Sequence, residues 1–443
     1  MKHLKIWKRT HRFIDADSKN FKLIFFAFLI GAFVGALASL FRFILEKLDS
    51  LRIALYSNVD SSNIFSWALA LLFGIIGVSI SIFLVKKYAP ETSGSGVHEI
   101  EGALDELRPV RWKRVLPIKF IASIFSLGSG LLLGREGPTI QMGSSIGKMV
   151  KDLFHQADDN NNPFVSAGAA AGLASAFNAP FSGIIFVMEE MHGHFRYNFF
   201  SMAAIMVASG TADFVSRILV GTSPVIQMTI FENPPASSIW LFILLGAIFS
   251  FIGLFFNKLL IFTLDLFSSL SMNMTIITTI IAGLLIASIG ILNPNMIGGG
   301  YDTIRLVIDK SFSLQFLIIL FISRFLFTIF SYGIGAPGGI FAPLLALGVV
   351  LGFVFGSIAQ HYFPDSISDP TIFAVAGMAG IFASTVRAPI TGLMLAVEMT
   401  SNFELLLPLI FTSVTAALIT TQLGNQPIYT ILLERTLKKS NSI

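Results

Sequence analysis

Long apolar runs, separated by short polar segments, make up most of the chain. Other apolar runs are too short to cross a bilayer, which is typical of the half-helices that line transport sites. The pattern predicts an all-α polytopic membrane protein in which broken, tilted helices accompany full-length ones. A helix that crosses a bilayer takes roughly 20 residues, and the runs that clearly reach this length cover residues 23–40, 64–85, 239–262, 276–292 and 314–330.

The second half of the chain repeats motifs of the first half at a nearly constant offset. The offset is 205 positions from Gly128 to Gly333 and again from Pro138 to Pro343. Further blocks, in the same order, give offsets of 204 (residue 93 to 297) and 209 (residue 167 to 376). Duplicated, glycine-broken apolar segments predict two pseudo-symmetric halves with a transport site between them. The identities alone leave open whether the halves are parallel or inverted.

The polar segments predict how the chain is organised. Lys and Arg residues gather near both termini and at residues 108–114, so the positive-inside rule predicts that both termini are cytoplasmic. We expect an uncleaved first helix rather than a signal peptide, and no soluble regulatory domain. The predicted parts are an N-terminal arm, a first half-repeat, a linker, a second half-repeat and a tail, at residues 1–20, 21–220, 221–238, 239–435 and 436–443.

Composition excludes most soluble classes of protein. The 443 residues are 54% hydrophobic and 13% charged, with a mean hydropathy of +0.77, and ordinary soluble domains do not have this balance. The absence of cysteine excludes a disulfide framework, a thiolate zinc site and a cysteine nucleophile. The net charge of +4 is not a signature of nucleic-acid binding. We therefore expect a lipid bilayer around the protein, no nucleic-acid partner, and no metal or cofactor.

The glycine-containing motifs suit the binding of an anion. Moving a bare anion into a medium of low dielectric constant costs on the order of tens of kcal/mol, and a fixed counter-cation would hold the ion too tightly to pass. Backbone N–H groups at helix N-termini carry partial positive charge and can stabilise the anion instead. Glycine allows the backbone to approach the ion closely, and proline is tolerated at a helix start.

Glu136 is an ionisable residue between Gly134 and Gly137 within apolar sequence, which makes it a functional candidate. As a carboxylate, it can occupy an anion position beside the helix N-termini, and as a neutral acid it can swing away. An anion that enters also favours the neutral acid by repulsion between like charges. One side chain can therefore gate a pore and link anion occupancy to proton binding.

At these residues the chain resembles the CLC family of chloride channels and chloride/proton antiporters, over about residues 20–435. The resemblance implies an inverted repeat of tilted helices without cytoplasmic CBS domains, one pore per subunit and a homodimer. It also implies chloride as the bound substrate. It rests on four motifs in order: Gly94-Ser95-Gly96-Val97-His98, Gly134-Arg135-Glu136-Gly137-Pro138, Gly339-Ile340-Phe341-Ala342-Pro343, and Tyr429 within Asn425-Gln426-Pro427-Ile428-Tyr429.

The resemblance assigns roles to individual residues. Glu136 is implied as the outer gate and proton site, and Glu190 as the inner proton-transfer acid. Serine at position 95 fits chloride rather than nitrate by family analogy. The implied chloride ligands are the Ser95 hydroxyl, the backbone N–H groups of Ile340 and Phe341, and the Tyr429 hydroxyl.

Some positions leave alternatives open. His98 stands where the family usually has proline, either as an ordinary polar substitution or as a pH sensor near the inner mouth. Glu189 has a repeat counterpart in Glu398, which favours a structural role, but it could also be a water-wire neighbour of Glu190. Glu190 itself is either the inner acid or a helix-end glutamate that contacts Arg196.

The combined prediction is secondary active exchange of chloride for protons in the cytoplasmic (inner) membrane. The main alternative is a passive chloride channel, which has no need of the inner acid Glu190. A carrier for a cation or a metabolite predicts acidic pore linings, whereas this chain offers neutral donors. A membrane-embedded acid–base enzyme that uses Glu136 and Glu190 is disfavoured, because no nucleophile constellation or metal cluster supports it.

Overall fold

The computed structural model describes residues 2–60, 62–156, 162–191, 198–231, 233–309 and 312–441, with side chains from Phe21 to Lys439. All regular elements in these ranges are helices, which confirms the predicted all-α class. Backbone bridges join Gly94 to Pro337 and Gly134 to Gly339. Gly94, Gly134 and Gly339 lie in the predicted motifs, and Pro337 lies two positions before the third motif.

The helices of the two halves follow one another along the chain. Those of the first half are α1 (Lys2–Ser57), α2 (Ile64–Tyr88), α3 (Val97–Leu104), α4 (Trp112–Gly128), α5 (Glu136–Leu153), α6 (Pro163–Phe177), α7 (Pro180–Glu190) and α8 (Phe199–Val220). Those of the second half are α9 (Ile239–Ser268), α10 (Met272–Leu292), α11 (Tyr301–Asp309), α12 (Leu314–Gly333), α13 (Phe341–Tyr362), α14 (Thr371–Thr385), α15 (Pro389–Thr400), α16 (Leu406–Gln422) and α17 (Ile428–Asn441). Short 3₁₀ turns lie at Pro90–Thr92, Ala236–Ser238, Pro294–Met296, Pro364–Ser366 and Phe403–Leu405.

Eight helical segments of the described chain are long and apolar enough to cross a membrane. The five runs predicted from the sequence fall within α1, α2, α9, α10 and α12. The segments in α8, α13 and α16 were not singled out, because Pro, Gly, Ser or Thr residues interrupt their apolar runs. The shorter apolar helices α6, α14 and α15 have 10–17 residues, as expected for segments that do not cross fully.

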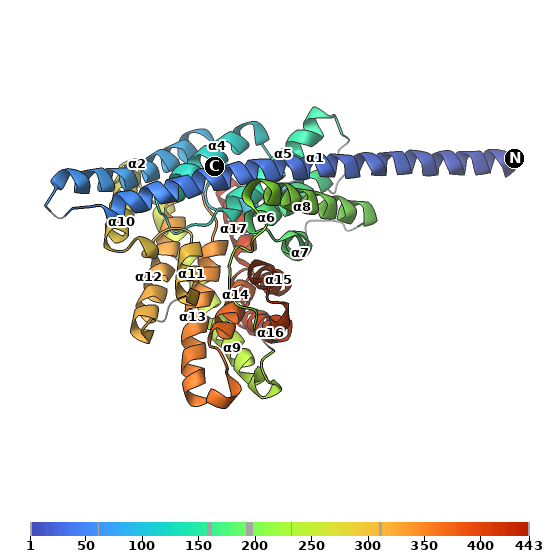
Figure 1. The fold of residues 1–443 in the computed structure, drawn as a ribbon. Coiled ribbons are helices and arrows are strands. Elements are labelled where there is room, and N and C mark those ends of the chain that lie inside the picture. The colour runs from blue at the N-terminus through green and yellow to red at the C-terminus, as the bar shows by residue number, and fades with distance from the viewer. Residues whose placement is uncertain are drawn as a thin grey trace.

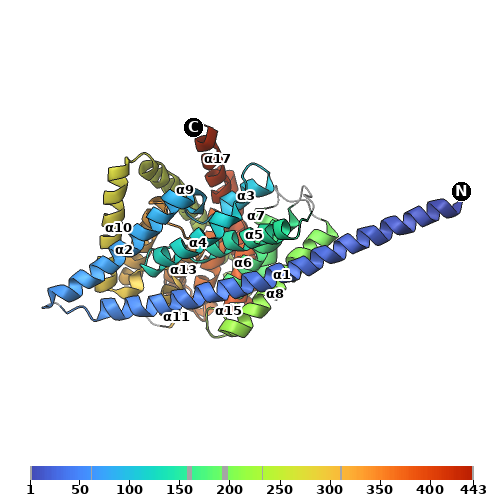
Figure 2. The same ribbon diagram turned by 90° about the horizontal axis from the view of Figure 1, so that it is seen from above.

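The two halves pack against each other as an inverted repeat. The helices of the first half lie around α1, and α9 and α12–α16 lie below them in Figure 1, while α17 returns to the first half (Figures 1 and 2). Gly134 and Gly339, which are equivalent in the repeat, exchange N–H···O hydrogen bonds of 2.7 Å in an antiparallel bridge. Such reciprocal pairing of equivalent residues is what a two-fold axis between the halves produces. The predicted two-fold relation of the halves is therefore confirmed.

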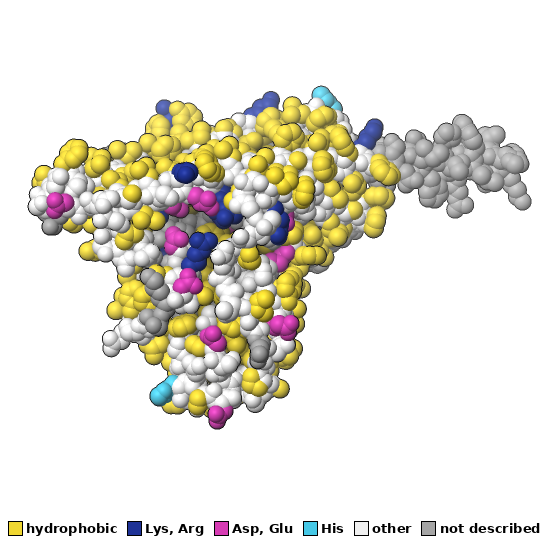
Figure 3. All heavy atoms as spheres, viewed as in Figure 1, with side chains coloured by type: hydrophobic (Ala, Val, Ile, Leu, Met, Phe, Trp, Pro, Cys, Tyr) yellow, Lys and Arg dark blue, Asp and Glu magenta, His cyan; other side chains and the backbone are white. Residues whose placement is uncertain are grey.

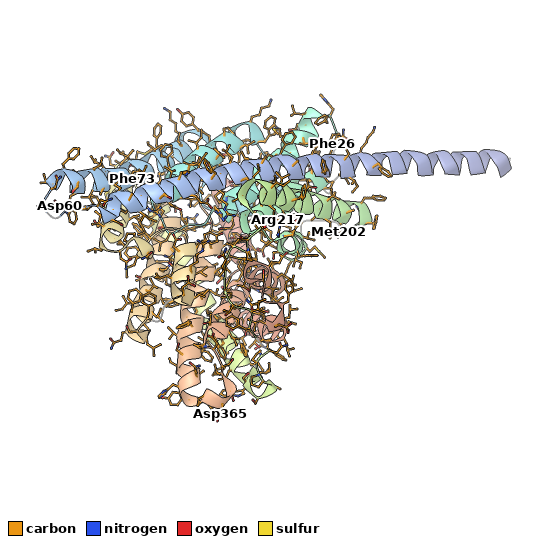
Figure 4. All side chains as sticks on the ribbon, viewed as in Figure 1. Phe26, Asp60, Phe73, Met202, Arg217 and Asp365 are labelled. Carbon is orange, nitrogen blue, oxygen red and sulfur yellow. The ribbon has the colours of Figure 1, made fainter. Side chains whose placement is uncertain are left out.

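Apolar side chains cover much of the surface. In Figure 3 they form most of the upper outline, whereas many of the visible charged side chains gather near the middle of the view. Aromatic contacts join α1 to its neighbours at two places. Phe26 of α1 and Phe73 of α2, both labelled in Figure 4, mark these places. The ring of Phe26 lies 4.9 Å from that of Phe154, and Phe73 lies 6.3 Å from Tyr56. These contacts hold α1 against the end of α5 and against α2.

Candidate ion-binding site

The structure brings three of the four predicted motifs together at helix N-termini. Helix α3 begins after Ser95, α5 begins at Glu136 and α13 begins at Phe341. The N–H of Gly94 donates to Ala336 O (3.2 Å), and the N–H of Gly338 donates to Gly94 O (2.9 Å). The first motif is thereby tied to the segment before α13, just as the Gly134–Gly339 bridge ties the second motif to it. Three sets of helix-terminal N–H groups therefore lie in one buried region.

Close backbone contact explains why glycine occupies the motif at position 137. A Cβ atom on Gly137 would lie 2.8 Å from Ser95 Cα and 3.0 Å from Gly339 Cα. Real Cβ atoms essentially never approach other atoms below 3.0 Å, so any side chain here would push the three motifs apart. Glycine is the residue that permits such an approach.

Glu136 lies at the start of α5, is fully buried, and turns its carboxylate toward the other half of the chain. The carboxylate accepts a hydrogen bond from the Tyr301 hydroxyl and a long one from the Ala342 N–H (3.4 Å). Ala342 is in the first turn of α13, so the carboxylate occupies a position that suits an anion at a helix N-terminus. A Cβ atom on Gly134 would lie 2.0 Å from Glu136 Oε2, so glycine at 134 leaves room for this carboxylate.

The four predicted chloride ligands are all fully buried: Ser95, Ile340, Phe341 and Tyr429. The rings of Phe341 and Tyr429 lie 5.8 Å apart, which places α17 beside the start of α13. The Tyr429 hydroxyl is buried without a hydrogen-bond partner. Buried hydroxyls nearly always have a partner, so this O–H is a donor available to a bound anion.

Two further tyrosines belong to the site and were missed from the sequence. The Tyr332 hydroxyl donates to the Ser95 hydroxyl (3.4 Å) and accepts a hydrogen bond from the Ser95 N–H (3.3 Å). Tyr301 holds Glu136, and its ring faces the Arg135 guanidinium at 4.8 Å. Both lie in or next to blocks of the repeat. Tyr332 is inside Ser-Tyr-Gly-Ile-Gly, and Tyr301 directly follows three glycines. The repeat was therefore the signal that could have identified them.

A buried lysine supports the first motif. Lys119 of α4 is fully buried, and its Nζ donates to Thr92 O (2.9 Å) and Gly94 O (2.7 Å). The lysine thus stabilises the carbonyls of the turn that carries Ser95. Burial lowers the pKa of this amine well below its usual range, so its role here is that of a hydrogen-bond donor to the turn. Nothing in the local sequence distinguishes this lysine from a surface residue.

Two cavities approach the buried motifs from different sides. One has a volume of about 380 Å³, and its lining includes Gly94, His98, Tyr332 and several arginines. The other has a volume of about 60 Å³ and is lined in part by Gly134, Arg135 and Tyr301. Glu136 is buried and contacts the lining of the smaller cavity through Tyr301. Both cavities therefore reach residues of the buried motifs.

Glu190 ends α7 and faces a second carboxyl group that sequence reasoning missed, Glu101 of α3. Both groups lie outside the eight spanning helices. Burial raises the pKa of each above its usual range, and so does a neighbouring negative charge, that of Glu190 for Glu101 and that of Glu189 for Glu190. Such a pair titrates as a unit and retains a proton at higher pH than a free glutamate does. Arg196, the alternative partner of Glu190, lies outside the described residues.

Glu189 and Glu398 cap each other's helices across the repeat. The Glu189 carboxylate accepts from the N–H groups of Ile390 (3.0 Å) and Thr391 (2.7 Å) at the start of α15. The Glu398 carboxylate accepts from Phe181 (3.0 Å) and Ser182 (2.7 Å) at the start of α7. Carboxylates at helix N-termini are stabilising. This geometry favours the structural role of Glu189 over that of a water-wire neighbour.

His98 lies in α3 and lines the larger cavity. Burial lowers the pKa of its imidazole to about 4. A lowered pKa means that the ring is neutral throughout the physiological range, so the hypothesis of a pH sensor near neutrality loses its support. No group of three or more His, Asp or Glu residues suited to a metal is present in the part of the chain that the structure describes.

Comparison with known proteins agrees with this geometry. A family model described as voltage gated chloride channel matches residues 77–421. The H(+)/Cl(-) exchange transporter ClcA of Vibrio parahaemolyticus is 42% identical over 432 residues, which covers 97% of this chain and 92% of the relative. ClcA of Salmonella schwarzengrund is 39% identical over 438 residues, with 98% and 93% covered.

Solved structures are similar over almost the whole chain. A slow cyanobacterial Cl⁻/H⁺ antiporter superposes with a TM-score of 0.92 at 37% identity, with 95% of this chain and 99% of the other covered. A eukaryotic CLC transporter has a TM-score of 0.80 at 21% identity, with 94% of this chain and 74% of the other covered. The second likeness concerns the fold alone.

Proposed function

Because the chain belongs to the voltage-gated chloride channel family, we propose that it is a secondary transporter that exchanges chloride for protons across a membrane. The relatives named above are exchange transporters, and they match over nearly the full length of the chain. The observation that carries the proposal is the Glu136 carboxylate, which lies in an anion position at the N-terminus of α13 and is bound by Tyr301 of the smaller cavity. A passive channel has no need of a second titratable group, the inner acid Glu190.

In this proposal chloride binds to neutral donors at the meeting point of the helix N-termini. The donors are the hydroxyls of Ser95 and Tyr429 and the N–H groups of Ile340 and Phe341. A hydrogen bond to a charged partner contributes about 1.5–3 kcal/mol, so several converging donors offset much of the cost of dehydration. The buried, unpartnered Tyr429 hydroxyl supports this assignment.

Glu136 couples chloride to protons by alternating between two states. Ionised, it accepts from Tyr301 and Ala342 and excludes chloride from that position. Protonated, it loses its attraction to the α13 N-terminus and can leave, which frees the N–H groups for the anion. Chloride then disfavours return of the ionised form by repulsion. Each passage of chloride is therefore linked to a proton on Glu136.

In this proposal Glu190 delivers protons to Glu136 from the inner, cytoplasmic side. Its carboxyl group faces Glu101, and the pair favours retention of a proton. A group that exchanges protons near neutral pH is suited to relay them. In this scheme protons and chloride use separate inner routes, because chloride enters through the larger cavity beside His98 and Tyr332.

Several wider features belong to the same proposal. The protein resides in the cytoplasmic (inner) membrane with both termini cytoplasmic, and it forms a homodimer with one pore per subunit. Its halves span residues 21–220 and 239–435, with a linker at 221–238, an arm at 1–20 and a tail at 436–443. It acts as a transporter without enzyme activity and needs no cofactor.

The test is a flux assay on the purified protein in vesicles, with chloride and pH recorded together. An exchanger moves protons against their gradient when chloride flows, and its reversal potential shifts when a pH gradient is applied. A reversal potential that ignores the pH gradient would identify a passive channel and overturn the proposal. Crystals soaked in bromide test the ion site separately, because an anomalous peak is expected beside Ser95, Phe341 and Tyr429.

A further inference from the structure

A groove lies between α2 and α10, two helices that are long and apolar enough to cross a membrane. Its volume is about 560 Å³, within the range of pockets that hold small organic ligands. Side chains along it are strongly exposed, including Phe83 (54%), Met272 (67%) and Ile276 (53%). The lining consists of Ser79, Ile82, Phe83, Lys86, Lys87, Met272, Thr275, Ile276 and Thr279.

The groove follows from the way the two helices cross. A Cβ atom on Gly74 would lie 2.6 Å from Gly283 O, and one on Gly283 would lie 2.5 Å from Ile75 Cα. The helices therefore touch backbone to backbone at this point. Toward the end of α2 and the start of α10 the lining side chains are larger, and a gap opens between them. Figures 1 and 2 both show α2 and α10 side by side at the edge of the body.

Two lysines close the far end of the groove, and neither has a carboxylate or hydrogen-bond partner in the described chain. Lys87 Nζ lies over the rings of Phe83 (5.1 Å) and Tyr88 (5.4 Å). Lys86 is the preceding residue of the same helix and also lines the groove. The nearest acid in sequence, Glu91, is bound by Arg114 at 2.6 Å. Two positive charges thus remain uncompensated beside an apolar channel.

A second groove on α2 offers an internal comparison. It has a volume of about 610 Å³ and lies between α1, α2 and α4. Its lining includes Phe73, which is labelled in Figure 4. Every residue that lines it is uncharged. The α2–α10 groove is therefore distinguished by its lysine pair, not by its depth or its apolar walls.

We propose that the α2–α10 groove binds an anionic phospholipid, with the phosphate against Lys86 and Lys87 and an acyl chain along Ile82, Phe83 and Ile276. Basic pockets between transmembrane helices recognise acidic headgroups, because charge complementarity adds to the burial of the chain. Lysines that only anchor a helix end in the interface would also attract acidic headgroups, but that attraction would not depend on the groove. The inference is independent of the transport cycle, since it concerns a surface remote from Glu136.

The test measures lipid binding to the full-length purified protein by native mass spectrometry, with phosphatidylglycerol and phosphatidylcholine as probes. Each lysine near an acidic headgroup contributes about 1 kcal/mol, so K86Q/K87Q should weaken phosphatidylglycerol binding roughly 30-fold. Phosphatidylcholine binding should not change. The variant K86R/K87R should retain the preference for phosphatidylglycerol, because the charges remain.

Two further variants separate the site from general surface charge. The K438Q/K439Q variant removes the same charge from α17 and should leave phosphatidylglycerol binding intact. The I276W variant fills the groove, keeps both lysines and should weaken the binding. The proposal is overturned if K86Q/K87Q binds phosphatidylglycerol like the unmodified protein, if K438Q/K439Q loses as much, or if I276W has no effect. Chloride flux in the same preparations verifies that each variant is folded.

Discussion

Replacing Glu136 by alanine removes the carboxylate that we propose as the gate of the transport path. In the unmodified protein this group accepts hydrogen bonds from Tyr301 and from the Ala342 N–H. At about 1.5–3 kcal/mol for each bond to a charged acceptor, the two donors hold it with about 3–6 kcal/mol. An entering chloride must compete with that amount. The variant frees both donors for the anion and leaves no titratable group at this position.

The measurement uses vesicles with equal chloride on both sides and a pH gradient of one unit. Unmodified protein should give a reversal potential different from zero, because its chloride current is tied to protons. The Glu136→Ala variant should give a reversal potential of zero and no proton movement, while chloride flux persists.

Glu46 provides a matched control for this experiment. It lines the same small cavity as Arg135 and Tyr301, but its side chain is 53% exposed and pairs with Arg42 at 2.7 Å. Glu46→Gln therefore removes a nearby negative charge without touching the α13 N-terminus, and coupling should survive. Proton flux that persists in Glu136→Ala would refute the reasoning. An equal loss of coupling in Glu46→Gln would also refute it, because the loss would then be due to the overall charge of the cavity.

The remaining predictions concern groups near the inner side and the repeat interface. Glu190→Gln should abolish proton movement while isothermal titration still detects chloride binding, and coupled proton flux in this variant would contradict the relay. His98→Pro should leave the pH profile of chloride flux unchanged between about pH 5.5 and 8, because the ring, with its pKa lowered to about 4, is neutral across that range. Glu189→Gln should lower the free energy of unfolding by about 2–4 kcal/mol, because the charge-assisted hydrogen bonds to the α15 N-terminus weaken. Flux assays of this variant should still find chloride coupled to protons. Glu398→Gln should match it by symmetry, and a stability loss in only one of the two would argue against reciprocal capping.

The sequence predicted the parts of the fold that depend on apolar runs and on the repeat. Five spanning segments followed from the apolar runs, and the equivalence of the glycine motifs in the two halves followed from their constant offset. The sense of the repeat did not follow from the identities, which carry no direction, and only the family resemblance implied that it is inverted.

Side chains that arrive from distant helices were the part that could not be predicted. Lys119 looks like any lysine in a helix, and only the fold brings it to the carbonyls of Thr92 and Gly94. Glu101 lies 89 positions before Glu190 in the sequence, and no periodic pattern connects them. A carboxyl group gains its proton affinity from burial and neighbours that sequence does not display, so the surroundings of Glu190 could not be predicted.

The reciprocal caps restrict how this molecule can move. Each half supplies a carboxylate that caps the N-terminus of a helix in the other half, Glu189 for α15 and Glu398 for α7. The bridge between Gly134 and Gly339 joins the halves a second time. Rocking of one repeat against the other, the usual way in which carriers alternate their openings, would break both sets of contacts at once. Motion during turnover should therefore be confined to a few rotamers, with the backbone framework standing still.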